Sequence, residues 1–325
     1  MTTGSIQARE PVPPALAERL AGRTLWLSGG RGFIGSAVAA LAAAAGARVV
    51  GFTGDVRDAD AVRRSVLETG PSLLIHLAAR VDVSRDPALM PVMDAVIRQG
   101  SAHVRAAARE LGDAQLVQVG TCEEYGTIPA PFGEEDEPSE PVSPYAAAKL
   151  AATRDALAEV DGDGLRVVVA RPFLTYGPGQ RPRQLIPALI KAVLAGRPFP
   201  MTAGRQTREV NYVDDVALGL LRAVTTVEAH GHVVNIGGGE ELAVRDLAAR
   251  VVRACGAEPG AVLQIGALPT RPGEVPRFWA DVRKAEVLLG HRPAVSLDEG
   301  LRRTVDAMRR GMSSPMEDDA DAAQR

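Results

Sequence analysis

Apolar runs of two kinds alternate along the first half of the chain. Short runs that are apolar at nearly every position are typical of strands buried on both faces. Longer stretches with apolar residues at helical spacing are typical of helices that pack on a sheet. Strands are predicted at residues 23–29, 48–52, 72–79, 114–121 and 166–173, and helices at 33–45, 58–70, 88–111 and 144–160. This alternation predicts an α/β fold, a Rossmann doubly wound parallel sheet.

The pattern becomes less regular after about Gly177. Helices are predicted at residues 185–196 and 243–256, a strand edge followed by a helix at 208–224, and a strand at 232–238. We interpret residues 23–176 as the dinucleotide-binding domain and 177–311 as a smaller C-terminal substrate-binding lobe, with some segments returning to the main sheet. Residues 1–22 are expected to form a mobile arm or a loosely docked helix, and the acidic residues 312–325 a disordered tail.

Composition and charge narrow the possible partners. The formal net charge is −3, so the chain has no basic field that would attract nucleic acid or an anionic membrane. The two cysteines, Cys122 and Cys255, predict no disulfide framework. The sequence shows neither a signal peptide nor a membrane-spanning run, so we expect a cytoplasmic protein. No cluster of His, Cys and Asp has metal-ligand spacing, and no metal site is predicted.

A glycine-rich turn follows the first predicted strand and opens the first predicted helix of the sheet. Gly29, Gly32 and Gly35 follow the pattern GxxGxxG. The first glycine permits a tight turn, the second lets the backbone approach a pyrophosphate, and the third lets the helix pack closely on the strand. The free N–H groups at the helix start can then bind the phosphates. The turn therefore predicts a bound dinucleotide.

The residues around the end of the second strand bear on the choice between NAD and NADP. An acid at this place usually holds the ribose 2′-hydroxyl of NAD. Here the strand ends at Thr53, and the nearest acid, Asp55, lies beyond it. Arg31, in the glycine-rich turn, is placed where it could reach a 2′-phosphate. These residues favour NADP, with NAD as the alternative.

A tyrosine and a lysine are four residues apart on a predicted helix. Tyr145 and Lys149 therefore share one helix face. An ammonium near a phenol lowers the pKa of the phenol, which can then exchange a proton with a hydroxyl or carbonyl oxygen of a substrate. Thr121, at the carboxyl end of the preceding strand, can donate a hydrogen bond to the same oxygen. The pattern predicts hydride-transfer chemistry at this edge of the sheet.

Further motifs follow one another in a recognisable order. They are His76–Ala79, Thr121–Gly126, Arg171–Pro178 and Asn211–Asp215. With the glycine-rich turn and the Tyr145/Lys149 pair, they resemble the extended short-chain dehydrogenase/reductases, also called the NAD-dependent epimerase/dehydratase family. The resemblance covers about residues 23–310. It implies a substrate that is a nucleoside-diphosphate sugar and a catalytic triad of Thr121, Tyr145 and Lys149.

The resemblance also implies which other residues line the site. The residues expected to contact the cofactor are Gly29, Arg31, Gly32, Phe33, Ile34, Gly35, Thr53, Asp55, Val56, Leu77, Ala78, Ala79, Tyr145, Lys149 and Pro172. Arg208 and Arg271 match positions that bind the diphosphate and the nucleotide ribose in the family. Arg183 and Lys191 are further candidate cations near the helix at 185–196, and Cys122 is expected on the substrate side.

Departures from the family pattern suggest which reaction is catalysed. The second strand runs almost at once into Asp55, where most epimerases and dehydratases insert a helix and a strand. This short connection resembles the NADPH-using ketoreductases of the family and predicts a sheet with one strand missing or reduced. Sugar 4,6-dehydratases carry Asp-Glu after the threonine, whereas this chain has Cys122-Glu123. A thiol replaces that acid poorly, so dehydration is disfavoured. Glu123 is either catalytic or a structural acid at a strand end.

These observations lead to one main hypothesis and two alternatives. The main hypothesis is an NADPH-dependent 4-ketoreductase of a nucleoside-diphosphate 4-keto-6-deoxysugar, with Tyr145 as general acid. The first alternative is a redox-neutral epimerase or decarboxylase that holds NAD tightly. The second is a non-catalytic regulator that senses a cofactor. By analogy with the family, the helices at about 88–111 and 144–160 are expected to pair in a homodimer.

Overall fold

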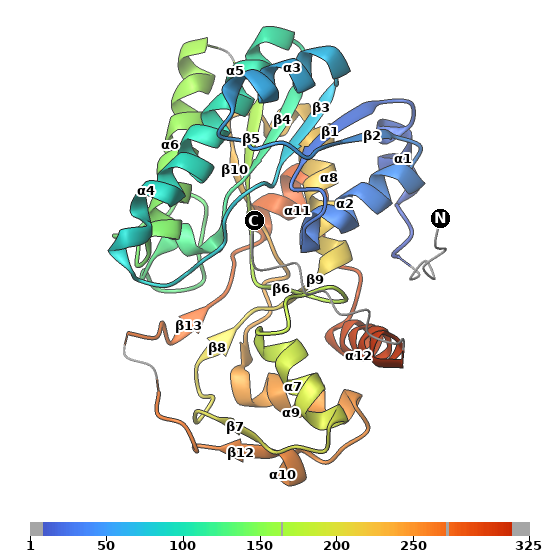
Figure 1. Ribbon diagram of the computed structural model, residues 1–325, viewed down its shortest axis with the longest axis vertical. Helices are drawn as coiled ribbons and strands as arrows, with labels where there is room; N and C mark the ends of the chain where they lie inside the picture. Colours follow the sequence, from blue (N-terminus) through green and yellow to red (C-terminus); the bar gives the residue numbers. More distant parts are fainter. Residues whose placement is uncertain (1–8, 164, 271–272, 314–325) are drawn as a thin grey trace.

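The computed structural model describes residues 9–163, 165–270 and 273–313 of the chain. A six-stranded sheet forms its centre, and a smaller lobe lies below it in Figure 1. In spatial order the strands are β10 (Val233–Ile236), β5 (Val167–Pro172), β4 (Gln115–Val119), β3 (Leu73–His76), β1 (Thr24–Ser28) and β2 (Arg48–Phe52). All neighbouring strands are parallel. The predicted doubly wound parallel sheet is confirmed.

Helices cover both faces of the sheet because successive strand residues point to opposite sides. Leu25 and Leu27 of β1 lie in the core under α2 and α8, and Trp26 lies in the core under α3, α5 and α6. These helices are α2 (Phe33–Ala44), α3 (Ala59–Thr69), α5 (Gly100–Leu111), α6 (Pro144–Asp163) and α8 (Val213–Thr225). Burial on both sides explains why the strand sequences are apolar throughout.

The chain between β3 and β4 is helical where one long helix is predicted. It consists of η1 (Pro87–Leu89), α4 (Met90–Met93), the π-helical turn η2 (Asp94–Gln99) and α5. Gly100 lies against Val56, and a Cβ atom there would be 2.9 Å from the Val56 side chain. This close approach places Val56, which follows the edge strand β2, beside the helix. No strand is added beyond β2 between residues 53 and 72.

The second half of the chain leaves the sheet after β5 and returns to it twice. Helix α8 returns to cover the sheet, and β10 returns to pair with β5. The lobe contains α7 (Leu185–Leu194), β7 (Phe199–Met201), β8 (Thr207–Arg208), β11 (Leu242–Ala243), α9 (Val244–Ala254), α10 (Pro259–Val262), β12 (Leu263–Ile265) and β13 (Arg277–Phe278). Between the two parts lie β6 (Thr175–Tyr176), which pairs with β9 (Asn211–Tyr212), and the 3-10 turn η3 (Cys122–Tyr125). The 3-10 turn η4 (Val227–Ala229) follows α8 and lies near the start of β5. The last elements of the described residues are α11 (Arg283–Leu289) and α12 (Leu297–Ser313).

The described part of the N-terminal segment is packed against the body of the protein. Residues Pro14–Leu20 form helix α1, and Leu16 and Leu20 are fully buried in the main core. The helix contacts α8. Of the two expectations for residues 1–22, the structure of residues 9–22 therefore shows a helix, and its apolar face is fixed in the core. Residues 1–8 lie outside the described part of the chain.

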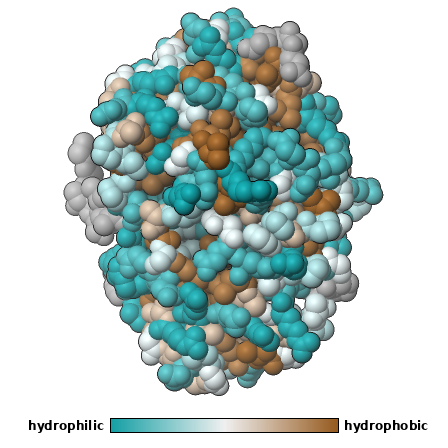
Figure 2. Space-filling model, turned by 180° about the vertical axis from the view of Figure 1, so that it is seen from behind, coloured by the Kyte–Doolittle hydropathy of each residue, from teal (hydrophilic) through white to brown (hydrophobic). Residues whose placement is uncertain are grey.

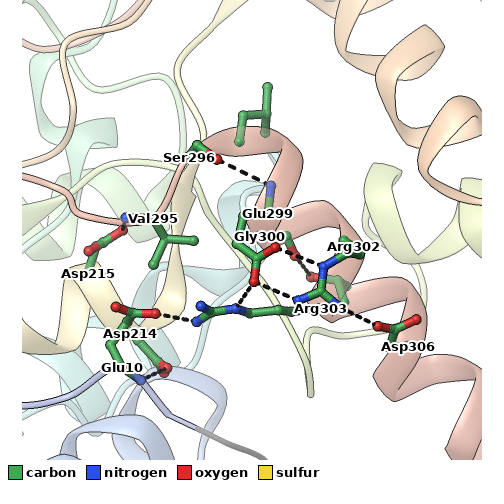
Figure 3. A network of polar contacts seen from close by, with 12 residues as sticks. Glu10, Asp214, Asp215, Val295, Ser296, Glu299, Gly300, Arg302, Arg303 and Asp306 are labelled. Carbon is green, nitrogen blue, oxygen red and sulfur yellow. Dashed lines mark hydrogen bonds and ion pairs between the residues drawn. The ribbon is translucent and has the colours of Figure 1, made fainter.

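Ion pairs join this segment to α8 and α12 (Figure 3). Arg9 Nη1 is 2.5 Å from Asp214 Oδ1, and the Glu10 backbone N–H donates to the other oxygen of Asp214 at 3.1 Å. Arg303 pairs with Glu10 and also donates through Nε to Glu299 at 2.6 Å. Acids in the first turn of α8 also suit the positive end of its dipole. Glu10 thus links three segments that are distant in the sequence, because its backbone N–H donates to Asp214 of α8 and its carboxylate accepts Arg303 of α12.

The surface is mixed in character. The face in Figure 2 is mainly hydrophilic, and its apolar side chains form small, separate groups. Within residues 9–163, 165–270 and 273–313, no helix is both long and apolar enough to cross a membrane.

The boundaries of the domain and the lobe stay a prediction. The acidic tail expected at 312–325 lies almost entirely outside the described residues, which end at Ser313 in α12.

We expect Leu20→Ala to lower the free energy of unfolding by about 2–5 kcal/mol, because the truncation leaves a cavity in the main core. Urea denaturation of the full chain measures the change. Val287→Ala is the matched control, because Val287 is 87% exposed and its truncation should change the free energy by less than about 0.5 kcal/mol. Equal effects of the two substitutions would show that α1 contributes nothing to the core.

Candidate active site

A crevice of about 830 Å³ lies at the carboxyl ends of the central strands. Its walls come from both the sheet and the lobe, so residues distant in the sequence meet there. In open α/β sheets this edge is where ligands bind. The crevice contains the glycine-rich turn, the Tyr145/Lys149 pair and Arg208 together.

The glycine-rich turn has no room for side chains at two of its glycines. Gly29 has φ +71°, and a Cβ there would be 2.8 Å from the backbone nitrogen of Ala78. A Cβ on Gly35 would be 2.1 Å from the carbonyl oxygen of Gly29. Gly32 is the N-cap of α2 and places no side chain on the free N–H groups of the first turn. This bare helix start fits a pyrophosphate.

Most of the residues predicted to contact the cofactor line the crevice, and two do not. Gly29, Gly32, Phe33, Ile34, Gly35, Asp55, Val56, Leu77, Ala78, Ala79, Tyr145, Lys149 and Pro172 are in its lining. Arg31 and Thr53 are exposed and lie outside the lining, next to residues that belong to it. The Asp55 carboxylate is 2.5 Å from Arg57, which lowers its pKa through hydrogen bonds.

Tyr145, Lys149 and Thr121 all line the crevice at the carboxyl end of β4. Tyr145 lies in the first turn of α6 and is 6% exposed. The nearby ammonium had led us to expect a lowered pKa for its phenol, but the pKa is raised, because burial outweighs the hydrogen bond with Thr121 that opposes the rise. Burial lowers the pKa of Lys149 to about 8, while the negative charge of Glu124 opposes this fall. Lys149 Nζ donates to the Val119 carbonyl oxygen at 2.5 Å, which fixes the ammonium at the end of β4.

His76 supports the turn after β3 and is not a free base. Its Nδ1 is 2.7 Å from Ser28 Oγ, and that oxygen accepts the backbone N–H of Ala78 at 3.2 Å. Burial lowers the pKa of His76 to about 3, so the ring stays neutral. These hydrogen bonds join the ends of β1 and β3 and hold the Ala78 backbone, which lines the crevice.

Cys122 and Glu123 both line the crevice directly after Thr121. Burial raises the pKa of the Cys122 thiol well above its usual range, and the nearby Glu123 charge raises it further. Burial also raises the pKa of Glu123, while Arg208 opposes the rise. The thiol therefore stays protonated and is a very weak acid. Of the two carboxyl groups of this turn, Glu123 lines the crevice and Glu124 does not.

Among the predicted substrate-side cations, only Arg208 reaches the crevice within the described residues. It pairs with Glu274 at 3.2 Å and donates to the carbonyl oxygens of Thr207 and Val275. Arg183 and Lys191 are exposed and lie outside the lining. Arg271 lies outside the described residues.

The sequence interpretation missed a part of the lining. The additional residues include two arginines, two glutamines and several apolar side chains: Arg80, Val81, Val83, Val96, Phe173, Gln180, Arg181, Gln184, Leu185, Val210, Val244 and Leu247. Arg80 and Val81 follow β3 closely, so their place at a strand end was a usable signal. Those from α7 and α9 depend on how the lobe folds back, which the sequence pattern does not reveal.

A second hollow, of about 680 Å³, lies between residues 131–136 and 281–288. Two of its acids form ion pairs, Glu135 with Lys284 at 2.8 Å and Asp281 with Arg283 at 2.5 Å. The other two, Glu134 and Asp136, accept the backbone N–H groups of Asn235 and Gly133. No group of His, Cys, Asp and Glu in the described part of the chain could hold a metal ion. The crevice at the strand ends is therefore the candidate active site.

Known proteins share this architecture. The model of the NAD-dependent epimerase/dehydratase family matches residues 25–237. The chain is 36% identical to a dTDP-glucose 4,6-dehydratase of Streptomyces griseus over 253 residues, 78% of this chain and 75% of the relative. It is 32% identical to a UDP-glucose 4-epimerase of Mycolicibacterium smegmatis over 260 residues, 78% and 81% of the two chains. The crystal structure of DesIV, a dTDP-glucose 4,6-dehydratase of Streptomyces venezuelae with NAD bound, superposes with a TM-score of 0.77, covering 90% of this chain and 99% of that one, at 32% identity.

We expect Gly35→Ala to weaken dinucleotide binding by at least about tenfold, because its Cβ would collide with the Gly29 carbonyl oxygen and push the turn away from α2. Fluorescence titration with NADPH measures the dissociation constant. Gly51→Ala is the matched control, because nothing lies within 4 Å of a Cβ at that position in β2. Unchanged affinity in Gly35→Ala would contradict the assignment of the turn.

We expect kcat/KM to fall as the pH rises through about 8, because Lys149 then loses the charge that the phenol needs. The fall should approach tenfold per pH unit on the alkaline side. In Lys149→Arg the guanidinium stays charged, so activity should be lower overall but without this alkaline limb. An alkaline limb near pH 8 that persists in Lys149→Arg would assign it to another group.

Proposed function

Since the chain belongs to the NAD-dependent epimerase/dehydratase family, as its motifs indicated, we propose that it is an NADPH-dependent 4-ketoreductase of a nucleoside-diphosphate 4-keto-6-deoxysugar. The observation that carries the proposal is the content of the crevice. It holds one proton-transfer set, Thr121, Tyr145 and Lys149, and a buried thiol follows it.

The buried thiol argues against loss of water from the sugar. A leaving hydroxyl has to be protonated by an acid, and Cys122 stands directly after Thr121 with a pKa raised by burial. A thiol of this kind gives up its proton poorly. What the crevice supports is the interconversion of a carbonyl and an alcohol, which needs one hydride and one proton.

The protonation state of Tyr145 favours the direction of reduction. Burial raises the pKa of the phenol, so the proton stays on its oxygen at neutral pH. A bound NADPH would supply the hydride that adds to the C4 carbonyl carbon. Tyr145 would donate its proton to the C4 oxygen, Thr121 would hold that oxygen by a hydrogen bond, and the Lys149 ammonium would stabilise the phenolate that remains.

Charges at the outer end of the crevice support NADPH as the reductant. No acid stands at the end of β2, where Thr53 follows the strand. Asp55, the next acid, is neutralised by its ion pair with Arg57. Arg31 is exposed in the turn before α2. A 2′-phosphate would therefore meet no unpaired carboxylate among these residues. On the substrate side, the Arg208 guanidinium lines the crevice, which supports a substrate that carries a negatively charged diphosphate.

A redox-neutral 4-epimerase with tightly held NAD is the second candidate. The observation in its favour is the 32% identity to a UDP-glucose 4-epimerase. The same three residues could first remove a proton from the C4 hydroxyl and later return it. The two functions differ in their consumption of cofactor, because only a net reduction oxidises one NADPH for each sugar.

We expect the purified chain to oxidise NADPH in the presence of a dTDP- or GDP-linked 4-keto-6-deoxysugar, followed at 340 nm, and to prefer NADPH to NADH. Tyr145→Phe should bind NADPH with unchanged affinity and lose at least about a hundredfold in kcat, because the proton donor is gone.

Conversion of a UDP-sugar into its C4 epimer without a change at 340 nm would favour the second candidate instead. Full turnover by Tyr145→Phe would refute the role of the phenol in either function.

A further inference from the structure

A buried carboxylate lies directly behind the catalytic threonine. Glu124 is fully buried in the short turn η3, which begins after Thr121. Its Oε1 accepts the backbone N–H of Thr121 at 2.8 Å, and its Oε2 accepts Arg171 Nε at 2.9 Å. The carboxylate also fills the space beside Gly120, where a Cβ atom would be 2.4 Å from Oε1. Every polar atom of this side chain is therefore used to fix the end of β4.

The same turn orients the hydroxyl of Thr121. Glu124 and Thr121 form a capping box, in which the Thr121 side chain accepts backbone N–H groups of the turn, among them that of Glu123 at 3.3 Å. A hydroxyl that accepts in this way keeps its own proton to donate elsewhere. The side chains of Thr121 and Tyr145 both line the crevice, and hydrogen bonding to Thr121 limits the rise in the pKa of the phenol.

Arg171 holds the far side of the carboxylate in place. It belongs to β5, the strand next to β4, and is 3% exposed. Its guanidinium stacks 4.5 Å from the centre of the Tyr125 ring. The Tyr125 hydroxyl in turn donates to Asn235 Oδ1 on β10 at 2.7 Å. The position of Glu124 is thus set by contacts that reach across three strands of the sheet.

We propose that Glu124 is a positioning residue for Thr121: by binding the Thr121 backbone and the Arg171 guanidinium, it holds the threonine hydroxyl against the Tyr145 phenol. The proposal rests on the proposed function in one respect, that Thr121 assists proton transfer by Tyr145. Glu124 itself touches neither substrate nor cofactor in this arrangement, because it is absent from the lining of the crevice.

Two substitutions separate positioning from stability. Glu124→Ala removes both hydrogen bonds, so kcat should fall by about a hundredfold while KM for the sugar nucleotide changes by less than about threefold. Glu124→Gln keeps an oxygen that can accept the Thr121 N–H but leaves the Arg171 charge unpaired in the core. We expect this variant to recover most of kcat although its melting temperature stays low. A merely structural role would make kcat follow the melting temperature in both variants.

Asp215→Ala is the matched control. Asp215 is a buried carboxylate of α8 that accepts the backbone N–H groups of Ala294 at 2.8 Å and Val295 at 3.1 Å, outside the crevice (Figure 3). Its loss should lower the melting temperature without changing kcat per folded molecule. Thr121→Ala supplies the second control, because adding Glu124→Ala to it should reduce kcat little further. A multiplicative loss in the double variant, or equal kcat losses in Glu124→Ala and Asp215→Ala, would overturn the proposal.

Hydrogen exchange keeps this test independent of the proposed function. If the wild-type chain reduces no 4-keto sugar nucleotide, the proposed function fails, and the Thr121 amide is then followed by NMR in ¹⁵N-threonine-labelled protein. The amide should exchange slowly in the wild type and in Glu124→Gln and at least about tenfold faster in Glu124→Ala, because only the last variant lacks an acceptor. Equal exchange rates in all three proteins would overturn the proposal.

Discussion

The contact between helix α6 and the carboxyl end of strand β4 governs the geometry of the active site. Two consecutive residues of β4 bind the helix: the Val119 carbonyl accepts Lys149 Nζ at 2.5 Å, and Gln118 Nε2 donates to the Ala152 carbonyl at 2.8 Å. Arg105 of α5, almost fully buried, donates to Gln118 Oε1 at 2.8 Å and fixes the orientation of that amide. Because the helix cannot slide along the strand, Tyr145 stays beside Thr121, which lies just beyond the end of β4.

The chemistry follows from burying these groups together. An ammonium out of contact with water holds its proton less tightly, and a phenol in the same surroundings holds its proton more tightly. Lys149 and Tyr145, one turn apart on α6 and both in the lining of the crevice, show these opposite pKa shifts. The Tyr145 phenol is neutral until it gives up its proton, and the Lys149 ammonium can stabilise the phenolate that remains. This combination suits the protonation of an alkoxide. The thiol of Cys122 cannot add an acid for dehydration.

Much of this arrangement could be predicted from the sequence because it depends on local periodicity. The apolar strands, the glycines at 29, 32 and 35, and the four-residue spacing of Tyr145 and Lys149 are each properties of short segments. The Glu124–Arg171 ion pair could not be predicted in this way, because its partners are 47 residues apart and meet only when β5 pairs with β4. The docking of α1 was also underestimated, since a helix of 7 residues with two buried leucines gives a weak periodic signal. Arg183 and Lys191 show the opposite limit. Their charge suggested ligand contacts, but Arg183, just before α7, and Lys191, on α7, are both exposed and lie outside the lining of the crevice.

The most direct test of this account is a crystal structure of the protein with NADPH and a nucleotide sugar bound. The account predicts that the sugar C4 oxygen lies within hydrogen-bond distance, about 2.6–3.2 Å, of both the Tyr145 phenol and the Thr121 hydroxyl, with the nicotinamide C4 facing the sugar C4 carbon. A sugar ring bound away from these two oxygens, or a nicotinamide ring that does not face Tyr145, would contradict it.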